Sequence, residues 1–223
     1  MEVIDKAVRE KRKNLTEFES KQLLSQYGVP VTRESLVKNA KQAVAFAEEM
    51  GYPVVLKGSG PELMHKTELE VVRLNLKNAR EVRQAFKEIK ARAGKKLKGC
   101  LVQEMVKGRR ELVAGLVRDP QFGPCVMFGL GGIYTEILRD VCFRVAPITE
   151  EDALDMMNEI RGKKILDAFR GMPPADKKLL AQALVGLGKL GVENSSVKEV
   201  DINPLLLSLE GKPVAVDALV ILA

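Results

Sequence analysis

The chain has 223 residues, of which 46% are hydrophobic and 30% are charged, a composition typical of globular proteins and not of disordered or fibrous ones. The formal net charge of +6 favours an anionic ligand or partner. An aromatic content of 4%, without tryptophan, supplies few stacking platforms for single-stranded nucleic acid.

The cysteines and the N-terminus indicate the compartment. The sequence has three cysteines, Cys100, Cys125 and Cys142. Their odd number and the absence of a CxxC pair favour reduced thiols over a disulfide framework or a zinc site. The N-terminus lacks the apolar core of a signal peptide, and no apolar run reaches about 18 residues. We therefore expect a cytoplasmic protein without a membrane partner.

The first half of the chain alternates helical and strand-like segments. An amphipathic helix over residues 3–13 precedes a second helix, which starts after the capping box of Thr16 and Glu19. Asn39 caps a helix that ends at Gly51, and a buried strand over residues 53–56 delivers Lys57 at its end. A strand over residues 71–76 and a helix capped by Asn78 with Glu81 follow. We expect residues 28–98 to form a small α/β lobe, and residues 1–27 to pack on a second lobe.

The second lobe is predicted over residues 99–223. It contains four strand-like segments, at residues 100–106, 111–118, 124–130 and 141–147, with tight turns at KGRR and RDPQFG connecting the first three. Helices are predicted over residues 149–161 and 176–190, before a closing hairpin at residues 197–223. The mixture of helices, strands and antiparallel hairpins predicts an α+β fold with two lobes.

The closing hairpin carries the strongest chemical signal. Alternation puts Asp201 and Asn203 on one face of its first strand, and a turn near Glu210 sets Asn203 opposite Asp217 to within one register step. A small number of hard oxygen ligands of this kind suits Mg²⁺ when it also binds the phosphates of a substrate. The alternative is that Asp217, isolated in an apolar run, pairs with a buried Arg or Lys.

Two residues near the end of the first buried strand are further candidates. Lys57 either contacts phosphate or is a strand-end lysine that extends to solvent. His65 is the single histidine of the sequence, and it is either a solvated loop residue or a nucleophile on a moving loop. The segment 60–67 is one residue from a phosphate-binding P-loop, but His65 occupies the position of the second glycine, so we reject that motif.

Three further stretches are less specific, and two of them have two interpretations. Residues 103–106 could meet an adenine edge and a ribose, or form a partly exposed edge strand. Residues 109–111 could be a solvated turn. The glycine-rich residues 129–132 could form a bulge or a close approach to a ligand.

Taken together, the chain resembles an ATP-grasp domain, and more narrowly the β subunit of ADP-forming acyl-CoA synthetases of the acetate–CoA ligase type, which are relatives of succinyl-CoA synthetase. The match spans nearly the whole chain after about residue 15. It is carried by YGVPV at 27–31, GYPVVLK at 51–57, PELMHKTE at 61–68, RDPQFGPCVMFGLGGIYTEILRD at 118–140, FRVAPITEEDAL at 143–154, EVDINPLL at 199–206 and VDA at 216–218.

The resemblance implies an ATP-grasp fold of two α/β lobes with the nucleotide site between them. It also implies a phosphoryl relay. A CoA-binding α subunit makes an acyl phosphate, a histidine of that subunit takes the phosphoryl group, and His65 then carries it to ADP. We expect an α2β2 heterotetramer that uses ATP/ADP and Mg²⁺, without a nucleic-acid partner.

The resemblance also implies the roles of individual residues. Catalytic roles fall to His65 and Asp201, and metal ligation to Asn203 and Asp217. Nucleotide contacts are implied for Lys57, Glu104, Val106, Glu111 and Arg144.

Three departures from the family pattern stand out. The pair Glu70-Val71 replaces a Gly-Gly pair after the histidine loop, and Leu219 replaces a basic residue. Nothing in the chain resembles a CoA-binding domain. Two alternative functions are another ATP-grasp ligase, which joins a carboxylate to an amine through an acyl phosphate, and a non-enzymatic basic module that binds nucleic acid.

Overall fold

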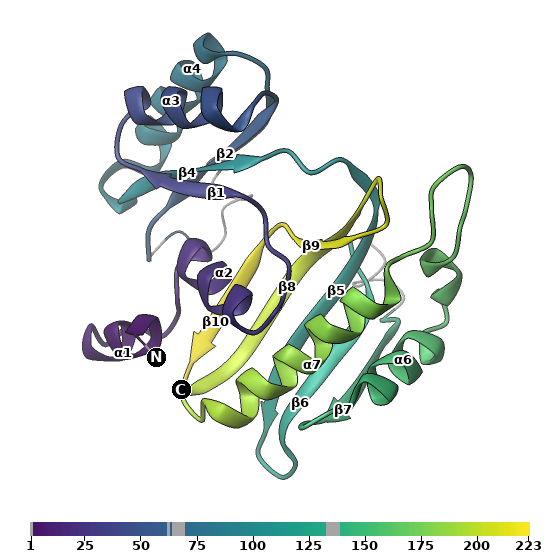
Figure 1. Ribbon diagram of the computed structural model, residues 1–223. Coiled ribbons are helices and arrows are strands. Elements are labelled where there is room, and N and C mark those ends of the chain that lie inside the picture. The colour runs from purple at the N-terminus through teal and green to yellow at the C-terminus, as the bar shows by residue number, and fades with distance from the viewer. Residues whose placement is uncertain (1, 62, 64–69, 133–138) are drawn as a thin grey trace. The chain divides into compact units, whose positions relative to one another are not determined.

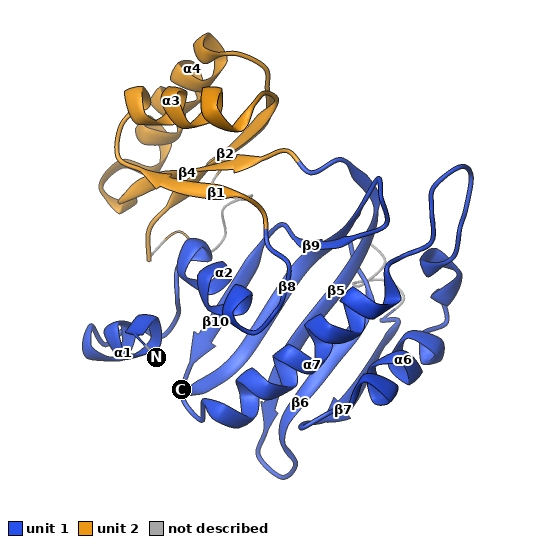
Figure 2. Ribbon diagram, in the orientation of Figure 1, with its two compact units in different colours: residues 1–31, 106–223 blue, residues 32–105 orange. Residues whose placement is uncertain are grey.

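The structure is a computed structural model, and it describes residues 2–61, 63, 70–132 and 139–223. The chain divides into two compact units (Figure 2). Unit 1 comprises Met1–Val31 and Val106–Ala223, and unit 2 comprises Thr32–Met105. The architecture is the predicted mixture of helices and antiparallel sheets.

Unit 2 is a small sheet with helices on one face. Its sheet has the strand order β1-β4-β2-β3, and α3 and α4 pack on the buried side chains of that sheet (Figure 1). The elements in chain order are β1 (Glu34–Val37), α3 (Ala40–Met50), β2 (Val54–Ser59), β3 (Val72–Leu76), α4 (Ala79–Ala93), η1 (Gly94–Lys96) and β4 (Gly99–Glu104).

The position of β4 differs from the predicted boundary at residue 98. The strand pairs antiparallel with β1 and β2, and its Cys100 and Val102 complete the core of unit 2. The predicted hairpin at KGRR is therefore wrong, because the strands on its two sides belong to different sheets. An apolar strand followed by turn residues does not identify the strand that it will pair with.

Unit 1 is a larger sheet with the order β10-β8-β5-β6-β7, and β9 pairs with β8. Figure 1 shows α6 and α7 lying across one face of it. The elements are α1 (Glu2–Arg9), α2 (Glu17–Gln26), β5 (Gly108–Asp119), β6 (Gly123–Leu130), β7 (Val141–Val145), α6 (Glu150–Glu159), η2 (Lys163–Leu166), α7 (Lys177–Glu193), β8 (Val197–Ser208), β9 (Pro213–Ala215) and β10 (Ala218–Leu222).

The N-terminal helices belong to unit 1. Ile4 of α1 and Leu23 and Leu24 of α2 lie in its core. Helix α2 runs beside the edge strand β10, where the Ser20 hydroxyl accepts a hydrogen bond of 3.1 Å from the amide of Val220. This contact satisfies one backbone donor of an edge strand.

The predicted helix starts are confirmed. Thr16 and Glu19 form the reciprocal capping box of α2, and Thr149 forms one with Asp152 at α6. Asn78 caps α4 as predicted, but Glu81 accepts from the amide of Lys77 and not from that of Asn78.

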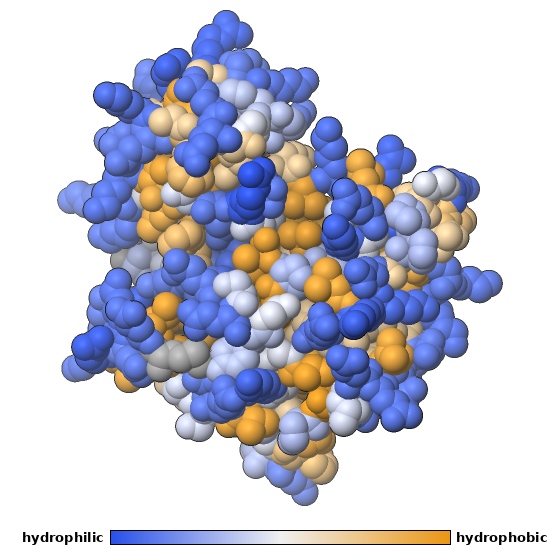
Figure 3. Space-filling view, in the orientation of Figure 1, coloured by the Kyte–Doolittle hydropathy of each residue, from blue (hydrophilic) through white to orange (hydrophobic). Residues whose placement is uncertain are grey.

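Hydrophilic side chains cover most of the face seen in Figure 3, and hydrophobic ones show through in patches. Among the described residues, no helix is long and apolar enough to cross a membrane.

Candidate functional site

The ribbon formed by β8, β9 and β10 has the register that the sequence predicted. Leu205 pairs with Ala215 before Asp217, and Ile202 pairs with Ala218 after it. Both pairings belong to one continuous register, so Asn203 lies across from Asp217. The turn is closed where the amide of Gly211 donates to the carbonyl of Ser208 at 2.9 Å.

Asp201 lies on the face of the sheet that α6 and α7 leave uncovered. Its neighbours along β8, Val200 and Ile202, are buried in the core beneath those helices, so alternation turns Asp201 the other way. Across the strands it pairs with Gly115 of β5 and Leu219 of β10. Gly115 has no side chain to fill the space beside the carboxylate, and a Cβ there would run into the carbonyl oxygen of Val200.

The electrostatics of Asp201 are set by its burial and by two neighbouring acids. Burial raises its pKa, and the negative charges of Glu199 and Asp217 raise it further. Among the described residues, no ion pair or hydrogen bond involves the Asp201 carboxylate. A bound cation would stabilise the ionised form of this carboxylate.

The donor set fits a hard divalent cation only if a ligand completes it. Within the described residues, no group of three or more His, Cys, Asp or Glu side chains could hold a metal ion. Asp217 and the side-chain oxygen of Asn203 supply few ligands, which is usual for Mg²⁺ that also binds substrate phosphates. The carboxylate of Asp217 also accepts a hydrogen bond of 2.9 Å from the amide of Ala218, which orients it.

Glu111 lies on β5, four residues before Gly115, so the two share a face at a distance of about 13 Å along the strand. The glycines at the end of β6 lie against it. The amide of Gly131 donates to the carbonyl of Glu111 at 2.9 Å, and a Cβ on Gly132, at φ +64°, would lie 2.5 Å from the Glu111 carboxylate. These glycines therefore allow the end of β6 to approach β5 closely, and the predicted approach to a ligand stays a prediction.

Arg144 does not join this group. It lies two residues after Cys142 on β7, and because Cys142 packs in the core, both side chains lie on the helix-covered face. Its guanidinium donates to Glu159 of α6 at 2.7 Å. Arg144 therefore lies on the face opposite to Asp201 and pairs with a glutamate, and the phosphate contact that the resemblance implies for it stays a prediction.

In unit 2, Lys57 lies inside a strand and not at its end. Strand β2 continues to Ser59, and Lys57 pairs with Leu101 of β4 and Val72 of β3. Its side chain is 4% exposed, on the face that α3 and α4 leave uncovered. This position excludes the alternative of a lysine that extends to solvent.

Glu104 lies where the chain leaves unit 2, and Val106 is the first residue of the following segment of unit 1. The Glu104 carboxylate accepts hydrogen bonds from the backbone amide of Arg33 at 2.7 Å and from its Nε at 3.2 Å. The amide of Glu104 in turn donates to the carbonyl of Arg33 at 3.0 Å. Glu104 therefore ties together the two segments that connect unit 2 to the rest of the chain.

His65 lies outside the described residues. The residue that follows its segment, Glu70, has φ +49°, a conformation that favours glycine. Its carbonyl accepts a 2.8 Å hydrogen bond from Arg73, and its carboxylate pairs with Arg92 of α4. These contacts explain how Glu70 occupies a position where the family pattern has glycine, and the sequence prediction did not include them.

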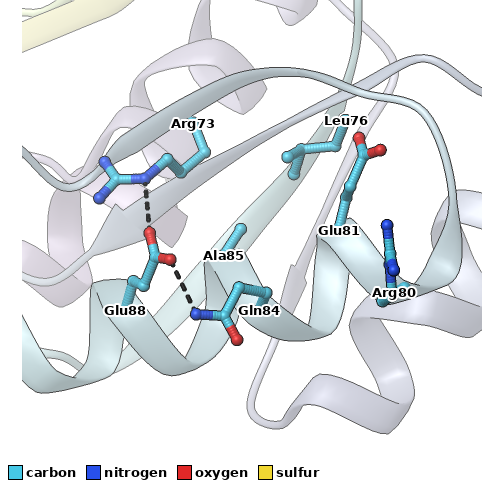
Figure 4. A pocket seen from close by; sticks show the side chains of 7 residues that line it. All are labelled: Arg73, Leu76, Arg80, Glu81, Gln84, Ala85 and Glu88. Atoms are coloured by element: carbon cyan, nitrogen blue, oxygen red, sulfur yellow. Dashed lines mark hydrogen bonds and ion pairs between the residues drawn. The ribbon is translucent and has the colours of Figure 1, made fainter.

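A hollow of about 410 Å³ lies between β3 and α4 on unit 2. Figure 4 shows that Glu88 crosses it, with hydrogen bonds to Arg73 and Gln84. Its two arginines and two glutamates balance in charge, and none of the predicted site residues lines it.

Comparison with known proteins agrees with the resemblance found in the sequence. Residues 6–222 match the ATP-grasp domain model. The chain is 46% identical to the acetate–CoA ligase [ADP-forming] I subunit beta of Pyrococcus furiosus, over 99% of this chain and 97% of that one. It is 41% identical to the 4-hydroxybutyrate–CoA ligase [ADP-forming] of Nitrosopumilus maritimus, over 94% of this chain but 31% of that one.

A solved structure is similar over the full length. The acetyl-coenzyme A synthetase 1 of Ca. Korarchaeum cryptofilum, in complex with coenzyme A and Mg-AMPPCP and with its phosphohistidine segment pointing towards the nucleotide-binding site, is 43% identical. The TM-score is 0.88, with 100% of this chain and 99% of that chain covered. The chain therefore belongs to the ATP-grasp family and, within it, to the β subunits of ADP-forming acetate–CoA ligases.

Proposed function

We propose that this protein is the nucleotide-binding β subunit of an ADP-forming acyl-CoA synthetase, which catalyses acyl-CoA + ADP + phosphate = acid + CoA + ATP. Its own step transfers a phosphoryl group between a phosphohistidine and ADP. The observation that carries the proposal is the β8–β10 ribbon, where Asp201, Asn203 and Asp217 gather oxygen donors and the pKa of Asp201 is raised by burial and by its acidic neighbours.

Asn203 and Asp217 are the residues that would hold Mg²⁺. Bound there, the ion would supply positive charge to offset the negative charge of the nucleotide phosphate oxygens. Asp201 lies beside this pair and keeps the local potential negative, which favours cation binding over the binding of a bare nucleotide.

The nucleotide contacts rest on the family resemblance together with the positions of the residues. Lys57 offers a buried ammonium for phosphate, and Glu104, the backbone at Val106, and Glu111 offer acceptors for the adenosine moiety. Glu104 keeps its bonds to Arg33, so a ribose hydroxyl would have to share this carboxylate. These roles stay predictions.

His65 is proposed to take the phosphoryl group. A P–N bond forms to an imidazole nitrogen as the bond to the donor breaks, and ADP then attacks phosphorus and releases the neutral imidazole. The CoA-binding half of the reaction belongs to an α subunit, in an α2β2 assembly. The longer relative, of which this chain matches 31%, is consistent with a further CoA-binding part outside this sequence.

The test follows the phosphoryl group. The complex with the α subunit is reconstituted and incubated with ³²P-labelled ATP and Mg²⁺. We expect an acid-labile, base-stable label on this chain, and His65→Ala should abolish label and turnover while ADP binding is kept. Since the sequence has a single histidine, a phosphohistidine on this chain can only be at that position.

Full turnover in the His65→Ala complex would disprove the relay. Turnover with an amine as acceptor, without a labelled histidine, would indicate the other kind of ATP-grasp ligase. Asp217→Asn serves as the matched variant for the metal site, and it should weaken nucleotide binding in the presence of Mg²⁺ but not in its absence.

A further inference from the structure

A short hairpin projects from unit 1 between η2 and α7 (Figure 1), and it has no role in the proposed nucleotide site. We call residues 166–175 the Phe169 hairpin. Phe169 and Met172 exchange backbone hydrogen bonds of 3.1 and 2.9 Å, and the amide of Ala175 donates to the carbonyl of Leu166 at 2.8 Å. Its tip, Arg170-Gly171, has φ angles of +46° and +79°, as a two-residue type I′ turn requires.

A buried arginine holds both strands of the Phe169 hairpin to the sheet. Arg110 of β5 is 5% exposed. Its Nη1 donates to the carbonyls of Ile165 at 3.0 Å and Asp167 at 3.1 Å, and its Nη2 donates to that of Pro173 at 2.7 Å. The hairpin base is also tied to the β8–β9 turn, because the amide of Asp176 donates to the carbonyl of Gly211 at 2.9 Å. The hairpin is therefore presented in one fixed conformation.

The tip displays an aromatic ring together with positive charge. The Phe169 ring is 55% exposed, and the guanidinium of Arg170 lies 5.0 Å from its centroid. The preceding segment adds the exposed side chains of Arg161, Lys163 and Lys164, whereas Asp167 is the one acid between residues 161 and 175. An exposed phenylalanine beside basic side chains has no evident role in the stability of the monomer.

Aromatic and arginine side chains that are exposed and preorganised are typical centres of protein interfaces. Their fixed conformation reduces the entropy cost of association. Because the surrounding charge is positive, the complementary surface is acidic. We propose that the Phe169 hairpin docks on an acidic surface of the CoA-binding partner subunit, with Phe169 filling an apolar pocket and Arg170 pairing with a carboxylate beside it. This inference rests on the proposed function, which requires such a partner.

Phe122 provides a matched control on the same unit. It is 61% exposed on the turn between β5 and β6. That turn is at the other end of β5 from Arg110, at a distance of about 30 Å along the strand. The turn carries Asp119 and lacks the basic neighbours of Phe169.

The experiment measures binding of the purified chain to its purified α subunit by titration calorimetry at two salt concentrations. We expect Phe169→Ala to weaken the complex at least tenfold, and Phe122→Ala to leave the dissociation constant within twofold. Arg170→Ala should weaken the complex and also reduce its dependence on salt. Binding of Mg-ADP to the isolated chain should be the same for all of them, and thermal melting of each variant checks that it is folded.

The proposal is overturned if Phe169→Ala and Arg170→Ala bind the α subunit as the unchanged chain does, or if Phe122→Ala is equally weakened. Loss of Mg-ADP binding in Arg170→Ala would also overturn it, since the hairpin would then serve the nucleotide. Failure of the unchanged chain to bind the α subunit would instead contradict the proposed function, and it is visible before any variant is tested.

Discussion

Arg110 and Asp201 lie on paired strands of the same sheet, β5 and β8. Burial favours the neutral form of each side chain, so it lowers the pKa of Arg110 and raises the pKa of Asp201. They differ in their surroundings. Arg110 donates to three backbone carbonyls, at 2.7 to 3.1 Å. Asp201 has the acids Glu199 and Asp217 as its charged neighbours, and the structure gives it no donor among the described residues.

The difference separates a structural charge from one that we propose to be functional. A buried charge that is hydrogen-bonded to backbone carbonyls holds elements together, as Arg110 does for the Phe169 hairpin. A partly buried carboxylate beside two other acids lowers the stability of the folded chain unless a cation binds near it. This arrangement is typical of binding sites. Burial alone would not distinguish the two residues.

The largest effect should come from removing the hydrogen-bonded charge of Arg110. Arg110→Met should lower the free energy of unfolding by about 3 kcal/mol, because three backbone carbonyls lose a charged donor. Urea denaturation followed by circular dichroism measures the change. Arg109→Met, at the exposed neighbouring position, is the control and should change stability by less than about 0.5 kcal/mol. Equal effects of the two substitutions would show that the bonds of Arg110 contribute little.

The second effect tests the proposed metal site. Mg-ADP at about 100 times its dissociation constant should stabilise the chain by about 2.7 kcal/mol, since it binds the folded state alone. Asp217→Asn should lose most of this gain at the same ligand concentration, and a thermal shift assay measures it. Asp155→Asn, at an exposed carboxylate of α6, should keep the full gain. If Asp217→Asn kept it too, the ribbon would not be the metal site.

The ribbon was predictable because its determinants are local. Strand alternation and a four-residue turn fix which residues lie opposite each other, so Asn203 and Asp217 were paired from sequence alone. The helix caps at Thr16, Asn39 and Thr149 were predictable for the same reason, since each cap depends on residues within one turn.

Other features depend on contacts that the sequence does not encode locally. The partner of β4 is chosen by the core of unit 2, and a tight turn at KGRR was an equally good local solution. Arg110 donates hydrogen bonds to backbone carbonyls, which every residue carries, so no sequence pattern indicates its partners. From sequence it was interpreted only as part of a possible solvated turn. Arg144 was assigned to a phosphate by resemblance, and the sequence did not indicate its hydrogen bond to Glu159 of α6. His65 lies outside the described residues, and its role stays a prediction.

The smallest effect concerns Asp201 itself, and its sign is opposite to that of Arg110. In the absence of nucleotide and metal, the raised pKa means that the folded chain holds this proton more tightly than the unfolded chain does. The stability of the unchanged protein therefore falls as the pH rises from the ordinary aspartate pKa, about 3.9, through the raised value. Asn cannot ionise, so Asp201→Asn should be close to neutral in acid and stabilising near pH 7, by about 1 kcal/mol.

Denaturation at several pH values measures this difference, with Asp155→Asn as the control that should show no such rise. Addition of Mg-ADP should then make the unchanged protein more stable than Asp201→Asn, because the cation stabilises a nearby ionised carboxylate more than a neutral amide. If Asp201 serves binding and not stability, Asp201→Asn should be more stable than the unchanged protein without ligand and should be stabilised less by Mg-ADP. If Asp201→Asn were destabilising at every pH, Asp201 would be a structural charge like Arg110, with a partner that compensates it in the folded chain.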